Sequence, residues 1–192
     1  MEALATTPAQ VLDLEALAAH RGSVLGELPG APQPSQKAFE TAIWSALARF
    51  DPARPVFVES ESRKVGNLRV PEALIHRMRE GRCLRLEAGP AVRTRLLLED
   101  YAHLVADPDR LREKLACLAP LHGNERIARW DGLVGAGDWA GLVADLLEAH
   151  YDPAYRRSMF RNDAGAATAE VVEVTDGSRD ASLALARGLA AK

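Results

Sequence analysis

The chain has 192 residues, a formal net charge of −3 and 47% hydrophobic residues. This length suits one domain with a sizeable core, and the composition is typical of a globular protein. No apolar run approaches the roughly 18 residues of a membrane span, and the first twenty residues do not have the pattern of a secretory signal. Two cysteines, Cys83 and Cys117, define no disulfide framework, so we expect a cytoplasmic protein with reduced thiols and no metal site.

Short apolar runs alternate with amphipathic patterns in the first half of the chain. The candidate strands are 10–14, 56–60 and 83–87, with a further one at 171–174. The candidate helices are 35–50, 71–80 and 91–105. Ser35 can cap the first of these helices, and Pro52 and Pro55 follow its end. Strands alternating with helices predict an α/β fold with a doubly wound parallel sheet.

The remainder of the chain reads as helical. Its candidate helices are 109–119, 124–134, 138–149, a short one after Pro153, and a last one near 179–191. Residues 162–170 are small and polar and are typical of a linker. We therefore expect a partial α/β domain over 1–105, a helical part of the same domain over 106–161, and a linker with a terminal strand and helix over 162–192.

Two carboxylates follow the strand candidate at 56–58. If the strand continues, Glu59 and Glu61 share a face and could hold Mg²⁺, directly or through water, or orient a reacting group. Alternatively, they cap the next helix or pair with Arg63. Arg63 and Lys64 could bind phosphate or could balance the two carboxylates.

Two polar blocks lie between the first two strands. In the first, His20, Arg21, Gly22 and Ser23 follow a helical turn. Gly22 permits a positive φ, so the adjacent amides could form an anion-binding nest, or the block could be a helix C-cap. In the second, Gln33 and Gln36 flank a proline turn and could read a base edge or close the long loop 24–36.

Aromatic and basic residues provide a third group of candidates. Tyr151 and Tyr155, in the block YDPAYRRS, could stack on a nucleotide and clamp an RNA backbone, or they could be core tyrosines beside a turn. Between Arg63 and Arg95 the chain carries nine Lys and Arg against three Glu. Such a local basic field could bind phosphates in a protein that is acidic as a whole, or it could belong to solvated helix faces.

Several of these blocks carry a family resemblance. They are DLE at 13–15, HRGS at 20–23, QPSQ at 33–36, ESESR at 59–63 and YDPAYRRS at 151–158. In this order and spacing they resemble the phosphate-loop domain of bacterial tRNA 2-selenouridine synthases, from about Gln10 to Asn162. Enzymes of that family begin with a rhodanese-like domain whose cysteine handles the chalcogen, and a strand and a glycine-rich phosphate loop follow it.

The chain departs from the family in two respects. It has neither the rhodanese-like domain nor a G-x-x-x-x-G-K-[ST] loop, and its opening MEALATTPAQ resembles the last turns of the helix that follows such a loop. We therefore expect an incomplete P-loop-NTPase-like fold, either the carboxy-terminal part or a truncated form of a longer enzyme. Such a chain is expected to be inactive on its own and to self-associate through an exposed sheet edge.

The resemblance also implies a chemistry. It implies a transferase that replaces sulfur by selenium in the wobble 2-thiouridine of tRNA, with tRNA as partner. Its substrates would be selenophosphate and geranyl diphosphate, and the reaction would pass through an S-geranylated uridine, with no cofactor in this chain. The alternative is a non-catalytic remnant that binds tRNA or serves as a scaffold.

Overall fold

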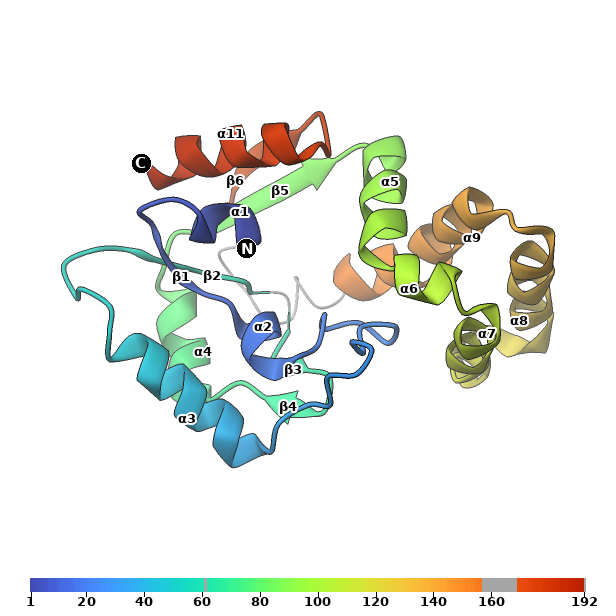
Figure 1. The fold of residues 1–192 in the computed structure, drawn as a ribbon, viewed down its shortest axis with the longest axis horizontal. Helices are drawn as coiled ribbons and strands as arrows, with labels where there is room; N and C mark the ends of the chain where they lie inside the picture. The colour runs from blue at the N-terminus through green and yellow to red at the C-terminus, as the bar shows by residue number, and fades with distance from the viewer. Residues whose placement is uncertain (61, 157–168, 192) are drawn as a thin grey trace. The chain divides into compact units, whose positions relative to one another are not determined.

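The computed structural model describes residues 1–60, 62–156 and 169–191 (Figure 1). These residues form two compact units. The α/β unit contains 1–85, 169–171 and 176–191, and the helical unit contains 86–156 and 172–175. The composition of the chain predicted a boundary at residue 105, and the compact units divide after Arg85.

The α/β unit is built around a short parallel strand pair. Strand β1 (Gln10–Leu12) pairs with β2 (Val56–Val58), and the register places Leu12 opposite Val58. The helices of this unit are α1 (Glu2–Ala5), α2 (Leu14–Ala18), α3 (Gln36–Leu47), α4 (Glu72–Arg79) and α11 (Arg179–Ala190). Helix α3 packs against β1 and α2, and α11 packs against α1 (Figure 1).

Local sequence explains where these helices begin and which face they bury. The Ser35 side chain accepts a hydrogen bond from the Ala38 amide and thereby caps α3. Phe39 and Ile43 recur at helical spacing and are buried, so α3 turns an apolar stripe towards the core. The core of the unit contains Leu12, Leu14, Ala18, Phe39, Ile43, Ala46, Val65, Leu68, Val70 and Ile75.

A hairpin completes the α/β unit. Strand β3 (Lys64–Val65) runs antiparallel to β4 (Leu68–Arg69), with Lys64 opposite Arg69 and Val65 opposite Leu68. Gly66 occupies the turn with φ +59°, a left-handed conformation that glycine adopts at little cost. Val65 and Leu68 are buried, which fixes the hairpin to the core by one face.

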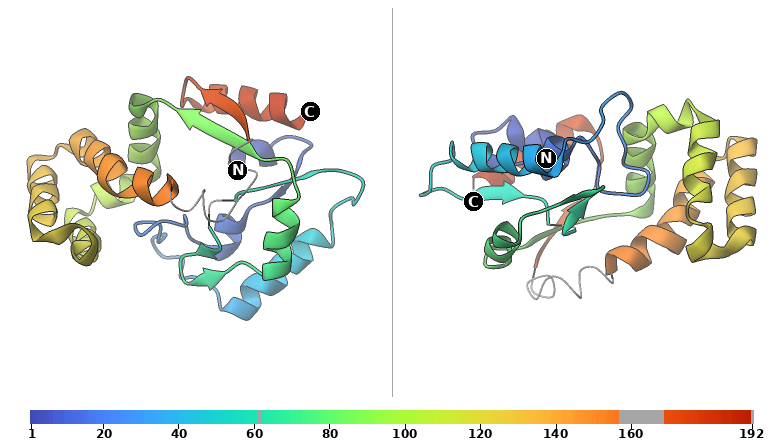
Figure 2. Two further views of the ribbon diagram at one scale, coloured as in Figure 1. Left: turned by 180° about the vertical axis from the view of Figure 1, so that it is seen from behind. Right: turned by 90° about the horizontal axis from the view of Figure 1, so that it is seen from below.

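The helical unit contains a succession of short helices. They are α5 (Pro90–Asp100), α6 (Ala102–Val105), α7 (Pro108–Ala116), α8 (Ala119–Ala136) and α9 (Trp139–Leu146), followed by the π-helical turn η1 (Leu147–Tyr151) and helical residues to 156. Helix α8 packs against α7 and α9, and α5 packs against α9 (Figure 2). Trp130 is fully buried within this unit.

The structure confirms a mixed α/β protein and corrects several details. The remaining strands, β5 (Leu84–Ala88) and β6 (Glu170–Val174), pair with each other, so the described strands form three two-stranded sheets. The doubly wound sheet therefore stays a prediction. The helix expected over 91–105 is broken at Tyr101, whose backbone leaves the helical region, and α8 is kinked at Gly123. No described helix has the length and apolar character required to cross a membrane.

Candidate functional site

Two carboxylates lie at neighbouring carboxyl ends of the parallel pair. Because Leu12 is opposite Val58, the next residues, Asp13 and Glu59, both meet the first turn of α2. Asp13 Oδ1 accepts a hydrogen bond from the Ala16 amide at 2.8 Å, and Glu59 Oε1 accepts one from the Glu15 amide at 2.7 Å. The carboxyl ends of parallel strands are where α/β proteins bind ligands, so we call Asp13 and Glu59 the strand-end carboxylates.

The Glu59 carboxyl is only partly satisfied. Its second oxygen, Oε2, is buried and has no hydrogen-bond partner among the described residues. Burial raises the pKa of Glu59, the hydrogen bond from the Glu15 amide acts in the opposite direction, and the negative charge of Asp13 adds to the rise. A half-buried carboxyl with a raised pKa is suited to transferring a proton, and such groups concentrate at functional sites.

The other charged residues of this block take different positions. Glu61 lies outside the described residues. Arg63 pairs with Glu72 at 3.0 Å, and not with Glu59, and both partners are exposed. Lys64 is exposed on β3. The structure therefore places Arg63 and Lys64 on the solvent side of the hairpin.

The block at 20–23 forms a closed turn. The Arg21 amide donates to the Gly26 carbonyl at 2.8 Å, and the Gly22 amide donates to His20 Nδ1 at 3.1 Å. His20 is buried and forms an isolated antiparallel bridge with Glu27. Gly22 has the expected positive φ of +70°, but the residue that caps α2 at its C-terminus is Ala19.

Both glutamines bond to backbone groups. Gln33 Nε2 donates to the carbonyls of Ala18 and Val65 at 3.2 and 3.0 Å, and its Oε1 accepts from the Asn67 amide at 2.8 Å. Gln36 brackets Arg69, since its Nε2 donates to the Arg69 carbonyl and its Oε1 accepts from the Arg69 amide. The two side chains thus fasten the loop 24–36 to the hairpin, which is the loop-closing alternative.

Tyr151 and Tyr155 belong to the helical unit. Tyr151 makes an edge contact with His150, with ring centroids 4.9 Å apart, and Tyr155 is 43% exposed. Between them, Asp152 receives a two-pronged hydrogen bond from Arg93. Chiefly because of that hydrogen bond, the pKa of Asp152 is lowered. The segment that contains Tyr151 and Tyr155 is therefore joined to α5 through the Arg93–Asp152 pair.

Sequence reasoning missed two groups of residues. Asp13 was not among the candidates, although its place after the first strand matches that of Glu59 after the second. His122 Nε2 lies 3.0 Å from His150 Nδ1, and the His122 ring meets Trp130 edge-on. No sequence signal indicates this second group, because it depends on the kink of α8 at Gly123 and on the packing of η1, which carries His150.

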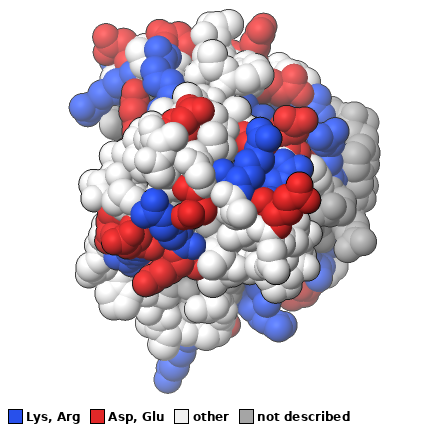
Figure 3. Space-filling view, turned by 90° about the vertical axis from the view of Figure 1, so that its right-hand side faces the viewer, with Lys and Arg blue, Asp and Glu red and all other residues white. Residues whose placement is uncertain are grey.

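The basic run is partly neutralised by ion pairs. Four of its arginines pair with acids: Arg63 with Glu72, Arg77 with Glu80, Arg82 with Glu170 and Arg93 with Asp152. On the face drawn in Figure 3, Lys and Arg side chains likewise lie beside Asp and Glu side chains. At least four of the eight arginines of this run are therefore paired with acidic side chains of the protein.

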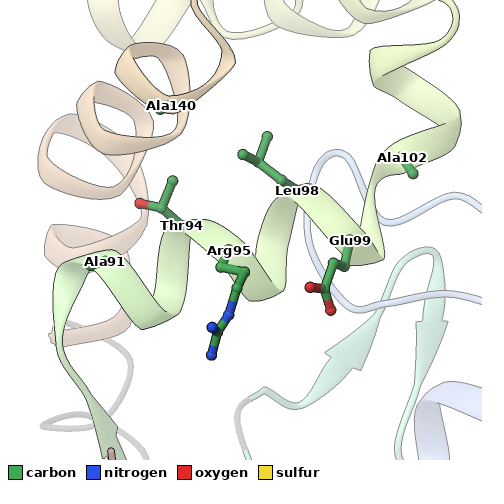
Figure 4. Close-up of a pocket in the computed structure, with 7 residues that line it drawn as sticks. All are labelled: Ala91, Thr94, Arg95, Leu98, Glu99, Ala102 and Ala140. Atoms are coloured by element: carbon green, nitrogen blue, oxygen red, sulfur yellow. The ribbon is translucent and has the colours of Figure 1, made fainter. Parts of the chain in front are cut away.

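An open groove of about 720 Å³ lies in the helical unit. It is lined by Ala91, Thr94, Arg95, Leu98, Glu99, Ala102 and Ala140. Figure 4 shows Thr94 and Leu98 on the side of α5 that faces Ala140. Of the residues that the sequence analysis singled out, Arg95 at the end of the basic run is the one that lines this groove.

The comparisons with known proteins find the same family that the sequence blocks resemble. Residues 2–115 match the family described as the tRNA 2-selenouridine synthase AAA domain. The tRNA 2-selenouridine synthase of Cupriavidus pinatubonensis is 32% identical, over 87% of this chain and 55% of that protein. Those of Marinobacter nauticus and Alcanivorax borkumensis are 38% and 39% identical, each over 75% of this chain and 47% of the relative. The chain thus spans about half the length of these relatives. No solved structure matches the chain.

Proposed function

Because this chain belongs to the tRNA 2-selenouridine synthase AAA-domain family, we propose that it serves the replacement of sulfur by selenium in the wobble 2-thiouridine of tRNA. The observation that carries the proposal is the family match over 2–115, which includes the strand-end carboxylates, the turn at 20–23 and both glutamines. The names of the relatives support tRNA as partner. Selenophosphate and geranyl diphosphate are the substrates we propose, with an S-geranylated uridine as intermediate.

Glu59 is our candidate for the acid–base group of this reaction. It ends a strand of the parallel pair, its pKa is raised, and one of its oxygens has no partner among the described residues. These properties suit a carboxyl that accepts a proton from one reacting group and returns it to another. Glu61 keeps its place as a second candidate.

The test is made in a strain that lacks its own 2-selenouridine synthase. The protein is expressed there, tRNA is digested, and its nucleosides are analysed by mass spectrometry for 2-thiouridine, S-geranyl-2-thiouridine and 2-selenouridine. Appearance of S-geranyl-2-thiouridine or 2-selenouridine supports the proposal. Glu59→Gln should then abolish formation of that nucleoside while leaving the melting temperature of the protein near that of the wild type.

The alternative is a non-catalytic protein that binds tRNA or serves as a scaffold. The observation in its favour is that the chain covers only 47% to 55% of the relatives named above. Unchanged nucleosides together with specific tRNA binding would favour this alternative. Unchanged nucleosides without tRNA binding would contradict both functions.

A further inference from the structure

The solvent face of the hairpin carries two like charges in direct opposition. The register pairs Lys64 with Arg69, and both residues are exposed. Since successive side chains of a strand point to opposite faces, the buried partners Val65 and Leu68 direct Lys64 and Arg69 to the same outer face. Like charges directly opposite each other destabilise an antiparallel pair, so this arrangement has no evident benefit to folding.

The two cations differ from most of their basic neighbours. Arg63, Arg77, Arg82 and Arg93 each have an acidic partner, whereas the described residues offer no ion-pair partner to Lys64 or Arg69. Within residues 1–60, 62–156 and 169–191, no acidic side chain forms an ion pair with either cation, and both cations are exposed to the solvent.

The backbone beneath them is held by other groups. Gln36 brackets the Arg69 backbone, and Gln33 bonds to Val65 and Asn67 on the adjoining turn. The Val70 amide also donates to the Arg63 carbonyl at 3.0 Å, which extends the ladder beyond the two paired positions. The polar contacts that position the hairpin therefore do not include the Lys64 and Arg69 side chains.

We propose that Lys64 and Arg69 form a two-cation contact for phosphate groups of an RNA backbone. The assignment rests on the proposed function, because that function supplies the RNA. A guanidinium offers a planar fork and an ammonium a compact charge, and an anion between them removes the repulsion that the free hairpin carries. The shared ligand chemistry is a phosphate oxygen, from either a polynucleotide or a small diphosphate, and we commit to the polynucleotide.

The decisive experiment measures the affinity of the full chain for unmodified tRNA over a series of salt concentrations. Each phosphate contact contributes about 0.7 to 0.9 to the slope of log affinity against log salt. The double variant Lys64→Ala and Arg69→Ala should therefore lower that slope by roughly 1.5. The control is Lys37→Ala with Arg49→Ala, which also removes one exposed lysine and one exposed arginine from the α/β unit and should leave the slope unchanged.

A second variant separates binding from folding. Lys64→Glu replaces a repulsive pair across the hairpin by an attractive one, so its melting temperature should stay level or rise while its affinity for tRNA falls. If the tRNA slope is unchanged in the double variant, or if the wild type does not bind tRNA at low salt, the assignment is overturned. The same holds if inorganic pyrophosphate binds in a manner that depends on Lys64 and Arg69 while the tRNA slope does not change. Formation of 2-selenouridine is a separate readout, so loss of the RNA contact and loss of the proposed function can be told apart.

Discussion

The α/β unit and the helical unit differ in how their polar side chains join distant parts of the chain. In the α/β unit, Gln10, Gln33 and Gln36 bond to backbone amides and carbonyls that are far away in the sequence. In the helical unit, charged side chains bond to one another: Arg93 to Asp152, and Arg126 and Arg129 to Asp145. Ion pairs occur in the α/β unit too, but there these glutamine side chains also join distant segments of the backbone.

The difference follows from how each unit satisfies its backbone. A helix closes its own hydrogen bonds, so its side chains are free to join one helix to another. Strands of two or three residues satisfy few backbone groups, and each buried group that remains requires a partner. The stability of the α/β unit should therefore be most sensitive to substitutions that alter the shape of a side chain. That of the helical unit should be most sensitive to substitutions that remove a charge.

The largest effect is expected at the hairpin turn. An added Cβ at Gly66 would lie 2.3 Å from Gln33 Oε1, and the backbone φ of +59° adds strain. Gly66→Ala should displace the side-chain amide of Gln33, which bonds to the backbone of Val65 and Asn67. We expect this change to destabilise the protein by about 3 kcal/mol. The same change at Gly132, an exposed helical position with free space around it, should instead stabilise by about 0.5 to 1 kcal/mol. Urea denaturation measures the free energy of unfolding of both variants. A similar loss of stability in Gly66→Ala and Gly132→Ala would contradict the expected difference between the two positions.

A change of charge should act on the helical unit. Asp145 accepts hydrogen bonds from Arg126 and from Trp130 Nε1, the latter at 2.6 Å. Asp145→Asn keeps the shape but leaves the arginines without a counter-charge. We expect a loss of about 2 kcal/mol, a value reduced because both arginines are partly exposed. Hydrogen exchange should show faster exchange in α8 and α9, whereas Asp131→Asn, which alters an exposed pair, should have little effect.

Acid should weaken the helical unit through the same carboxylates. The pKa of Asp152 is lowered, mainly by the hydrogen bond from Arg93. Burial of Asp145 acts to raise its pKa, but the bonds from Arg126 and Trp130 outweigh this, so its pKa is lowered as well. Carboxyls with a lowered folded-state pKa stabilise above their unfolded pKa of about 3.9, and that contribution is lost as pH falls through the folded value. Exchange measured at falling pH should therefore show α8, α9 and η1 losing protection, and Asp152→Asn should reduce that loss.

The smallest effect, of opposite sign, is expected in the α/β unit. The pKa of Glu59 is raised, primarily by burial. Its contribution to stability is therefore present below the unfolded pKa, and is lost as pH rises through the folded value. Glu59→Gln should leave stability at pH 7 unchanged or raise it slightly, and should flatten the loss of stability that follows as pH rises above the unfolded pKa of a glutamate. A marked fall in melting temperature at pH 7 would make Glu59 a structural residue.

The sequence predicted those features that repeat over many residues. Amphipathic patterns located α3 and α11, and Pro71 and Gly81 located the two ends of α4. Short apolar runs located β1, β2, β5 and β6 to within about two residues. The hairpin escaped notice because two-residue strands show no measurable alternation. The break at Tyr101 also carries no signal, since neither glycine nor proline stands there.

The site was predictable in part. Glu59 could be placed from the strand before it, and Gln33 from its proline turn. The long-range bonds of Gln33 could not be predicted, because they depend on how the loop folds back on residues more than thirty positions later. The pairing of His122 with His150 depends on helix packing in the same way.

The strand-end carboxylates have a consequence for the kind of ligand this end of the sheet accepts. Helix N-termini commonly attract phosphate, because free amides there carry partial positive charge. At α2 those amides already donate to Asp13 and Glu59, so an approaching anion meets acceptors where it would need donors. This position selects against phosphate and in favour of a proton, a cation or a neutral hydrogen-bond donor. An anionic ligand would therefore need positive charge elsewhere in the protein, away from the amides that Asp13 and Glu59 occupy.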